Sequence, residues 1–238
     1  GVALKRRGVS LLPQLRFPGA DMRIVFGQYF PMVAGALIMG STEIVDKSMA
    51  AALSSGSVSA LNYGNKIISL VLGLAATAIG TVMLPFFSKM VTAEDWKNIR
   101  ETLRFYLGLI FSITIPVVVL AFWFSEPLVH IVFQRGLFTP EDTQAVSSIQ
   151  AFFSFQIPFY IASIVVVRLI SSLRANHILM WGAVINLSVN IGLNFLFIHY
   201  LGLKGIALST SCVYFISFIF LFYFSYRLVS RKETVPPI

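Results

Sequence analysis

Residues 56–89 read GSVSALNYGNKIISLVLGLAATAIGTVMLPFFSK, and a run of 19 of them that begins at Ile67 carries no charge. An α-helix rises about 1.5 Å per residue, so a run of this length crosses the roughly 30 Å hydrocarbon core of a bilayer. Asn62, Asn65 and Lys66 precede the run within the same expected helix. A lysine near the membrane interior is costly unless it snorkels, pairs with an acid or lines a wet cavity. The stretch therefore predicts a membrane span with a polar end.

The composition of the whole chain agrees with a membrane protein. Hydrophobic residues make up 57% and charged residues 12% of the sequence, whereas about 25% of the residues of soluble domains are charged. The net charge of +8 is typical of basic loops that flank membrane helices. No Gly-rich phosphate loop or basic-aromatic patch is present, so we expect membrane lipids and no nucleic acid as partners.

Catalytic and metal-binding motifs are missing from the sequence. The single cysteine excludes a disulfide framework, and the three histidines have no carboxylate or cysteine at ligand spacing. No Ser-His-Asp order, acid pair or HExxH motif occurs. We therefore expect no metal, no cofactor and no enzymatic activity.

The predicted fold is an all-α polytopic membrane helix bundle with about six transmembrane helices. Residues 1–21 form a basic cytosolic connector, residues 22–230 the six-helix transmembrane lobe, and residues 231–238 a disordered tail. Residues 125–139 are expected to form a loop, and Thr139 to cap the helix that follows it. The spans cover residues 23–53, 57–90, 105–124, 144–173, 177–200 and 204–228. Pro31, Pro116 and Pro158 lie inside spans and are expected to bend them or break their backbone ladders.

The positive charges predict the orientation of the bundle. On the side of the N-terminus, counting residues at the span ends, Lys and Arg number five up to the start of the first span, four around the connection of spans 2 and 3, two around that of spans 4 and 5 (Arg168 and Arg174), and three around the end of span 6. The opposite side has only four. The positive-inside rule then places both termini in the cytosol.

Charged residues also lie at the outer ends of the first two spans, where Glu43, Asp46, Lys47 and Lys66 are found. They could line a polar cavity that faces outward, with Lys66 contacting an anionic ligand and Asp46 or Glu43 a cation or proton. Alternatively, the helices protrude from the bilayer, and these charges are solvated or pair with each other.

A stripe of asparagines follows one face of the fifth span, because Asn186, Asn190 and Asn194 recur every four residues. Isolated polar groups are costly in lipid, so the stripe should face protein or water, with the polar residues 209–211 of the sixth span opposite it. It could supply interhelical hydrogen bonds only, or build a monovalent-cation or polar-substrate site with Asp46.

Several segments are similar to a known family. They are EIVDKSMAAAL (43–53), GSVSALNYGNKI (56–67), GLAATAIGTVMLPFFSK (73–89), FQRGLFTPEDT (133–143) and GLKGIALSTS (202–211). In this order and spacing they resemble the MurJ/MviN lipid II flippases, which belong to the multidrug/oligosaccharidyl-lipid/polysaccharide exporter superfamily. Any one segment alone is weak, but together they are specific.

The resemblance implies a transporter of two six-helix lobes in the bacterial inner membrane. The present chain would correspond to the C-terminal lobe, with the N-terminal lobe of the same protein as its missing partner. Such proteins move a lipid-linked saccharide pyrophosphate between leaflets by alternating access. Lipid II, the peptidoglycan precursor, is the first substrate to expect. Alternatives are another lipid-linked polysaccharide unit, a multidrug/cation antiporter and a non-transporting membrane scaffold.

The resemblance also implies roles for individual residues. Lys66 stands where the family has an arginine, so Lys66, Asn65 and Asn62 become substrate-binding residues for the pyrophosphate. Asn65 replaces the family's aspartate, and lysine lacks the bidentate fork of arginine. Asp46 matches a family acid. With Asn186, Asn190 and Thr210 it would form a site for a coupling monovalent cation or a proton.

Overall fold

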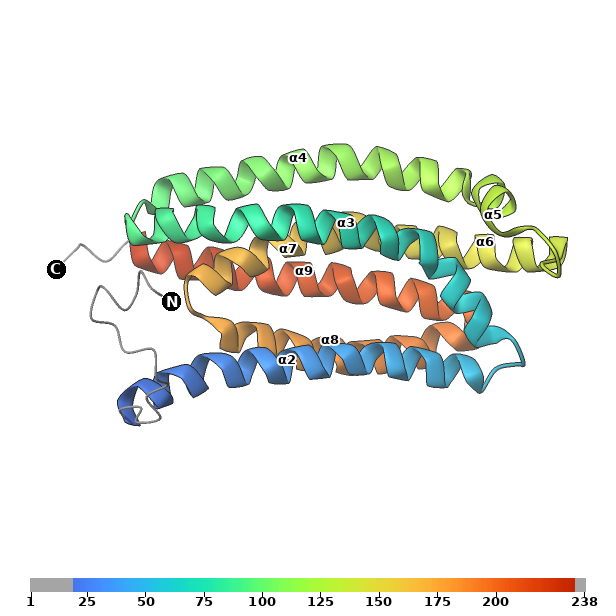
Figure 1. Ribbon diagram of the computed structural model, residues 1–238, viewed down its shortest axis with the longest axis horizontal. Helices are drawn as coiled ribbons and strands as arrows, with labels where there is room; N and C mark the ends of the chain where they lie inside the picture. The colour runs from blue at the N-terminus through green and yellow to red at the C-terminus, as the bar shows by residue number, and fades with distance from the viewer. Residues whose placement is uncertain (1–18, 234–238) are drawn as a thin grey trace, which may run out of the picture.

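The computed structural model describes residues 19–233 as a bundle of long helices lying side by side (Figure 1). No strand occurs within this range, which confirms the predicted all-α fold. The helices are α2 (Gly19–Ala51), α3 (Ser57–Thr92), α4 (Trp96–Trp123), α5 (Ser125–Phe133), α6 (Pro140–Ser154), α7 (Gln156–Ser172), α8 (Asn176–Leu201) and α9 (Leu203–Glu233).

Five segments of the described chain are long and apolar enough to cross a membrane: α3, α4, α6 together with α7, α8 and α9. They coincide with five of the six predicted spans. α2 is not among the five, so a sixth span at α2 stays a prediction. α2 is nevertheless part of the bundle, since it packs along α8 (Figure 1).

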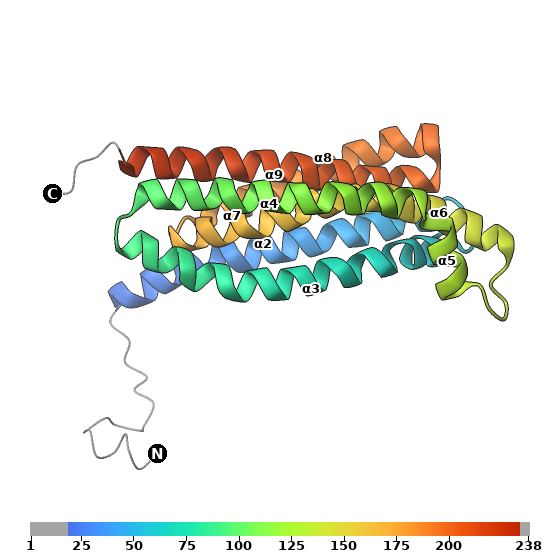
Figure 2. The ribbon, with the colours of Figure 1, turned by 90° about the horizontal axis from the view of Figure 1, so that it is seen from above.

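The structure corrects three predicted boundaries. Residues 125–133 form α5, although the sequence predicted a loop there; its nine residues are too few for a span and lie at one end of the bundle (Figure 2). α2 already includes residues 19–21 of the predicted connector, and α9 includes residues 231–233 of the predicted tail. The rest of the connector and of the tail lies outside the described residues.

Local signals explain two features of α6 and α7. Thr139 caps α6 as predicted: its Oγ1 accepts from the Asp142 amide at 3.2 Å, and the Asp142 carboxylate accepts from the Thr139 amide at 3.0 Å. The helix is interrupted at Phe155. Pro158 has no amide hydrogen to donate to the carbonyl of Ser154, which weakens the ladder at that point. α2 and α4 instead run without interruption through Pro31 and Pro116.

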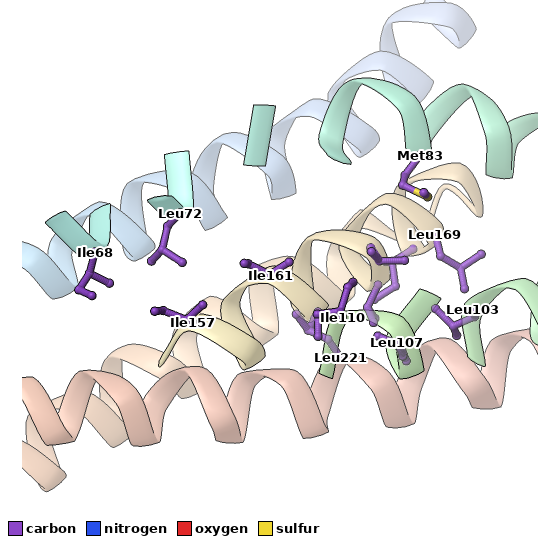
Figure 3. Packing of buried hydrophobic residues seen from close by; sticks show 14 of the residues in the cluster. Ile68, Leu72, Met83, Leu103, Leu107, Ile110, Ile157, Ile161, Leu169 and Leu221 are labelled. Atoms are coloured by element: carbon purple, nitrogen blue, oxygen red, sulfur yellow. The ribbon is translucent and has the colours of Figure 1, made fainter. Parts of the chain in front are cut away.

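α7 occupies the middle of the bundle, in contact with α3, α4 and α9. Figure 3 shows the apolar side chains that these helices bury against each other: Ile68, Leu72, Met83, Leu103, Leu107, Ile110, Ile157, Ile161, Leu169 and Leu221. Many large apolar side chains elsewhere, such as Phe105 and Ile113 of α4, are exposed on the outside of the bundle. An exterior of this kind suits contact with lipid. In lipid, helices associate through packing and interhelical hydrogen bonds, so buried polar contacts matter for the arrangement.

Candidate cation and head-group sites

Asp46, near the end of α2, is buried with 8% of its surface exposed and accepts hydrogen bonds from two other helices. Its Oδ1 accepts from Nδ2 of Asn190 at 3.0 Å and from Nδ2 of Asn194 at 2.7 Å, both on α8. Its Oδ2 accepts from Oγ1 of Thr210 on α9 at 3.1 Å. The carboxylate therefore joins three helices whose residues lie far apart in the sequence.

The asparagine stripe of α8 makes this meeting possible. Asn186, Asn190 and Asn194 are all buried, as their four-residue spacing predicted. Close packing brings α2 against the stripe: a Cβ added at Gly35 would lie 3.4 Å from the Met180 Cα of α8. A Cβ at this distance makes an ordinary van der Waals contact, whereas a longer side chain at position 35 would press against α8.

Within residues 19–233, no basic side chain is bonded to Asp46. The nearby Lys47 forms its ion pair with Glu43 at 2.6 Å instead, and both of these side chains are partly exposed. This pair matches the alternative in which the outer charges pair with each other. The donors to Asp46 are neutral amides and a hydroxyl, so its negative charge is left without a counter-charge among the bonds described here.

The residues that donate to the carboxylate also carry oxygen atoms. Asn190 Oδ1 lies 3.3 Å from Nδ2 of Asn194, and Thr210 Oγ1 lies 3.0 Å from the Ile206 carbonyl. Asn194 Oδ1 is buried and has no hydrogen-bond partner, an uncommon state for a buried amide. Carboxylate, amide and hydroxyl oxygens are ligands of hard cations. The group is chemically suited to a small cation or a proton.

The structure therefore brings together three of the four residues predicted for a cation site: Asp46, Asn190 and Thr210. Asn186 does not join them, because its amide donates to Ser217 Oγ at 2.9 Å. Asn194 takes the place expected of Asn186. The four-residue spacing predicted that the asparagines share one face of α8. The relative register of α2 and α8 selects which of them contact Asp46.

The three residues predicted for the head group lie on α3, near the end of the bundle where α2 passes into α3. Asn62 and Lys66 are exposed, and Asn65 is half-buried with its Oδ1 buried and unpartnered. Their spacing places them on one helix face. Lys66 Nζ has no hydrogen bond or ion pair within residues 19–233, although the lysine carbonyl accepts from Ser69 Oγ at 2.9 Å. Its charge is free to meet an anion.

Arg168 was assigned to the connection between two spans, but it belongs to α7. Its Nε is buried without a hydrogen-bond partner, and its guanidinium lies against Gly80 of α3, where an added Cβ would come within 2.7 Å of Nη2. It lines a cavity of about 340 Å³ among α2, α3, α7, α8 and α9. The polar residues of its lining are Tyr160, Ser163, Arg168, Asn186, Tyr214 and Ser217. Arg168 falls within the predicted span 144–173, but no local pattern predicts that its guanidinium is buried.

The fold and its buried polar groups define the chain as a polytopic helical membrane protein. The comparisons agree. A family profile described as "Lipid II flippase MurJ" matches residues 2–234. The chain belongs to the lipid II flippase MurJ family, which confirms the resemblance of its segments.

Individual relatives are distant in sequence. A "Probable lipid II flippase MurJ" of Vibrio cholerae is 26% identical over 220 residues, which cover 92% of this chain and 42% of that protein. One of Helicobacter pylori is 28% identical over 199 residues, covering 80% of this chain and 42% of that protein. The chain thus spans less than half the length of these relatives.

Solved structures show the same architecture. The structure "Lipid II flippase MurJ, inward closed conformation" matches with a TM-score of 0.72 at 27% identity, over 88% of this chain and 44% of that one. A Vibrio cholerae MATE transporter in a bent form matches with a TM-score of 0.76 at 14% identity, over 98% of this chain and 52% of that one. The second likeness concerns the fold alone.

Proposed function

We propose that the chain forms one lobe of a flippase that moves a lipid-linked saccharide pyrophosphate, with lipid II as its first substrate, across the bacterial inner membrane. The family match over residues 2–234 carries this proposal. The second lobe of the same protein is the expected partner, since the chain covers 42% of the length of its relatives. Alternating access of the two lobes would move the head group, and this transport needs no covalent step.

Lys66 is the proposed contact for the pyrophosphate. Its ammonium group is exposed and has no partner in the described chain, so binding an anion would break no existing ion pair. Asn62 and Asn65, on the same face of α3, could add amide donors to the phosphate oxygens. Lysine acts as a point charge without the planar fork of arginine, so we expect it to attract the pyrophosphate without fixing its orientation.

Asp46 with Asn190, Asn194 and Thr210 is the proposed site of a coupling monovalent cation or proton. For a cation, the amides of Asn190 and Asn194 would rotate, because their NH2 groups now point at the carboxylate. The unpartnered oxygen of Asn194 would then gain a positive neighbour. A proton would instead neutralise Asp46 with less rearrangement of the amides.

The short connection between α2 and α3 suggests how the two sites communicate. Asp46 lies five residues before the end of α2, and only residues 52–56 separate that end from α3. The hydrogen bonds accepted by the Asp46 carboxylate hold the end of α2 against α8 and α9. An ion that changed these bonds would shift the end of α2 and, through the connection, the end of α3 that carries Lys66. A ligand moves such an equilibrium only if it binds one state better.

We also infer the bundle's orientation from charge. Without the internal Arg168, thirteen Lys and Arg residues lie on one side and four on the other, so both ends of the chain would lie in the cytosol and Lys66 toward the outer side. Cysteine labelling from outside, at position 54 in the α2–α3 connection, tests this placement in the full-length protein.

The head-group role is tested by Lys66→Gln and Lys66→Arg in the full-length protein. The assay measures the appearance of lipid II in the outer leaflet. We expect Lys66→Gln to reduce flipping at least tenfold and Lys66→Arg to retain most of it, because only the arginine keeps the charge. Lys47→Gln is the matched control, since Lys47 is an outer-end lysine already paired with Glu43. Unchanged flipping by Lys66→Gln would remove Lys66 from the mechanism.

A further inference from the structure

A groove at the far end of the bundle from Lys66 has a different chemistry. It has a volume of about 420 Å³ and lies between α8 and α9, which run side by side (Figure 2). Its lining includes His177, Trp181, Phe220, Phe224, Arg227 and Arg231. We call these six residues the basic groove. We propose that the basic groove binds a phospholipid with an anionic head group.

The lining changes from apolar to basic along the groove. On α9, Phe220, Phe224, Arg227 and Arg231 follow one another at spacings of four, three and four residues, which places them on one helix face. α8 runs in the opposite direction, so His177 at its beginning lies at the arginine end of the groove. Acyl chains would contact the phenylalanines, and a phosphate would lie among the basic residues.

The charge of Arg227 is available for a ligand. Other basic residues at this end are engaged with protein: Arg100 pairs with Glu233, and Lys232 lies over the Trp96 ring at 5.4 Å. Arg227 has no ion pair, hydrogen bond or ring contact among those of residues 19–233. No acidic residue lines the groove. An anion would therefore meet the uncompensated positive charge of Arg227.

The position of the groove favours a lipid over a soluble anion. Both α8 and α9 are long and apolar enough to span a membrane, and Trp181 beside the arginines is 57% exposed. Tryptophan and arginine at the end of a span are typical of the membrane–water interface. Basic pockets between membrane helices recognise anionic head groups on the cytosolic side, which is the side that the charge count assigns to this end. The proposal needs no transport role for the chain.

Quenching of tryptophan fluorescence by brominated lipids tests the proposal. The full-length protein, with Trp181 as its only tryptophan and the others replaced by phenylalanine, is reconstituted with brominated phosphatidylglycerol or phosphatidylcholine. We expect phosphatidylglycerol to be preferred on the order of tenfold at Trp181, from two arginines near the surface. The double variant Arg227→Gln/Arg231→Gln should lose this preference.

Lys97→Gln/Arg104→Gln is the matched control, because it removes two exposed charges from the same end of the bundle outside the groove. The control should keep the preference of the parent protein. Three results would overturn the proposal: an unchanged preference in the Arg227/Arg231 variant, an equal loss in the control, or a Trp181 that neither brominated lipid quenches because protein covers it. A thermal unfolding curve is recorded for each variant to check that the bundle is folded at the temperature of the quenching measurement.

Discussion

Replacement of Thr210 by valine tests whether Asp46 is a charged hub of the bundle. Valine keeps the shape of threonine but cannot donate to Asp46 Oδ2, to which the Thr210 hydroxyl lies at 3.1 Å. A hydrogen bond to a charged group contributes about 1.5–3 kcal/mol, whereas a neutral bond contributes about 1 kcal/mol. We therefore expect Thr210→Val to lower the free energy of unfolding by about 2 kcal/mol.

Thr114→Val on α4 is the matched control. Thr114 is buried, and its hydroxyl donates only to the Ile110 carbonyl one turn earlier, at 2.7 Å. Thr210 has the same option at the Ile206 carbonyl, so the two substitutions differ in the bond to the carboxylate. The control should cost less than about 1 kcal/mol. Thr210→Ser, which keeps the hydroxyl, should remain near the parent.

Thermal unfolding of the purified full-length protein provides the measurement. One kcal/mol corresponds to about 2–4 °C for 150–250 residues and to less in a longer protein, so Thr210→Val should unfold at a measurably lower temperature than Thr114→Val. Equal melting temperatures for the two valine variants would refute the reasoning. They would mean that Asp46 is protonated in the bundle, or that the Thr210 hydroxyl bonds to Ile206 alone.

Two further predictions concern the same helices. Sodium ions should raise the melting temperature of the parent protein relative to choline at equal ionic strength. Asp46→Asn should abolish this rise. A rise that persists in the variant would assign the ion to another site. Gly205→Ala should destabilise the bundle by about 1–3 kcal/mol, because the new Cβ would overlap the Phe197 carbonyl of α8. Gly192→Ala, with open space around its Cβ, should be neutral or stabilising by up to about 1 kcal/mol. Equal melting temperatures for the two alanine variants would contradict the close α8–α9 approach.

Family membership could be predicted from the sequence because several separated segments match in order. The head-group residues match less well, since Lys66 and Asn65 both depart from the family's residues. The structure adds that Lys66 is exposed and has no ion pair in the described chain. An exposed lysine without an ion pair suits an anion site, and the family resemblance supplies the pyrophosphate as the anion to test.

Helices and their membrane character followed from local patterns: apolar runs, the Thr139 cap and the four-residue asparagine spacing all depend on residues close in the chain. α5 was not predicted, because a segment of nine residues is too short for its hydrophobic periodicity to distinguish a helix from a loop. The pairing of Asp46 with Asn190 and Asn194 instead joins residues 144 and 148 positions apart. The register between α2 and α8 selects that pairing, and it excludes Asn186. The burial of Arg168 against Gly80 has the same origin. A helical repeat shows which residues share a face, but only the close packing of whole helices decides what each face meets.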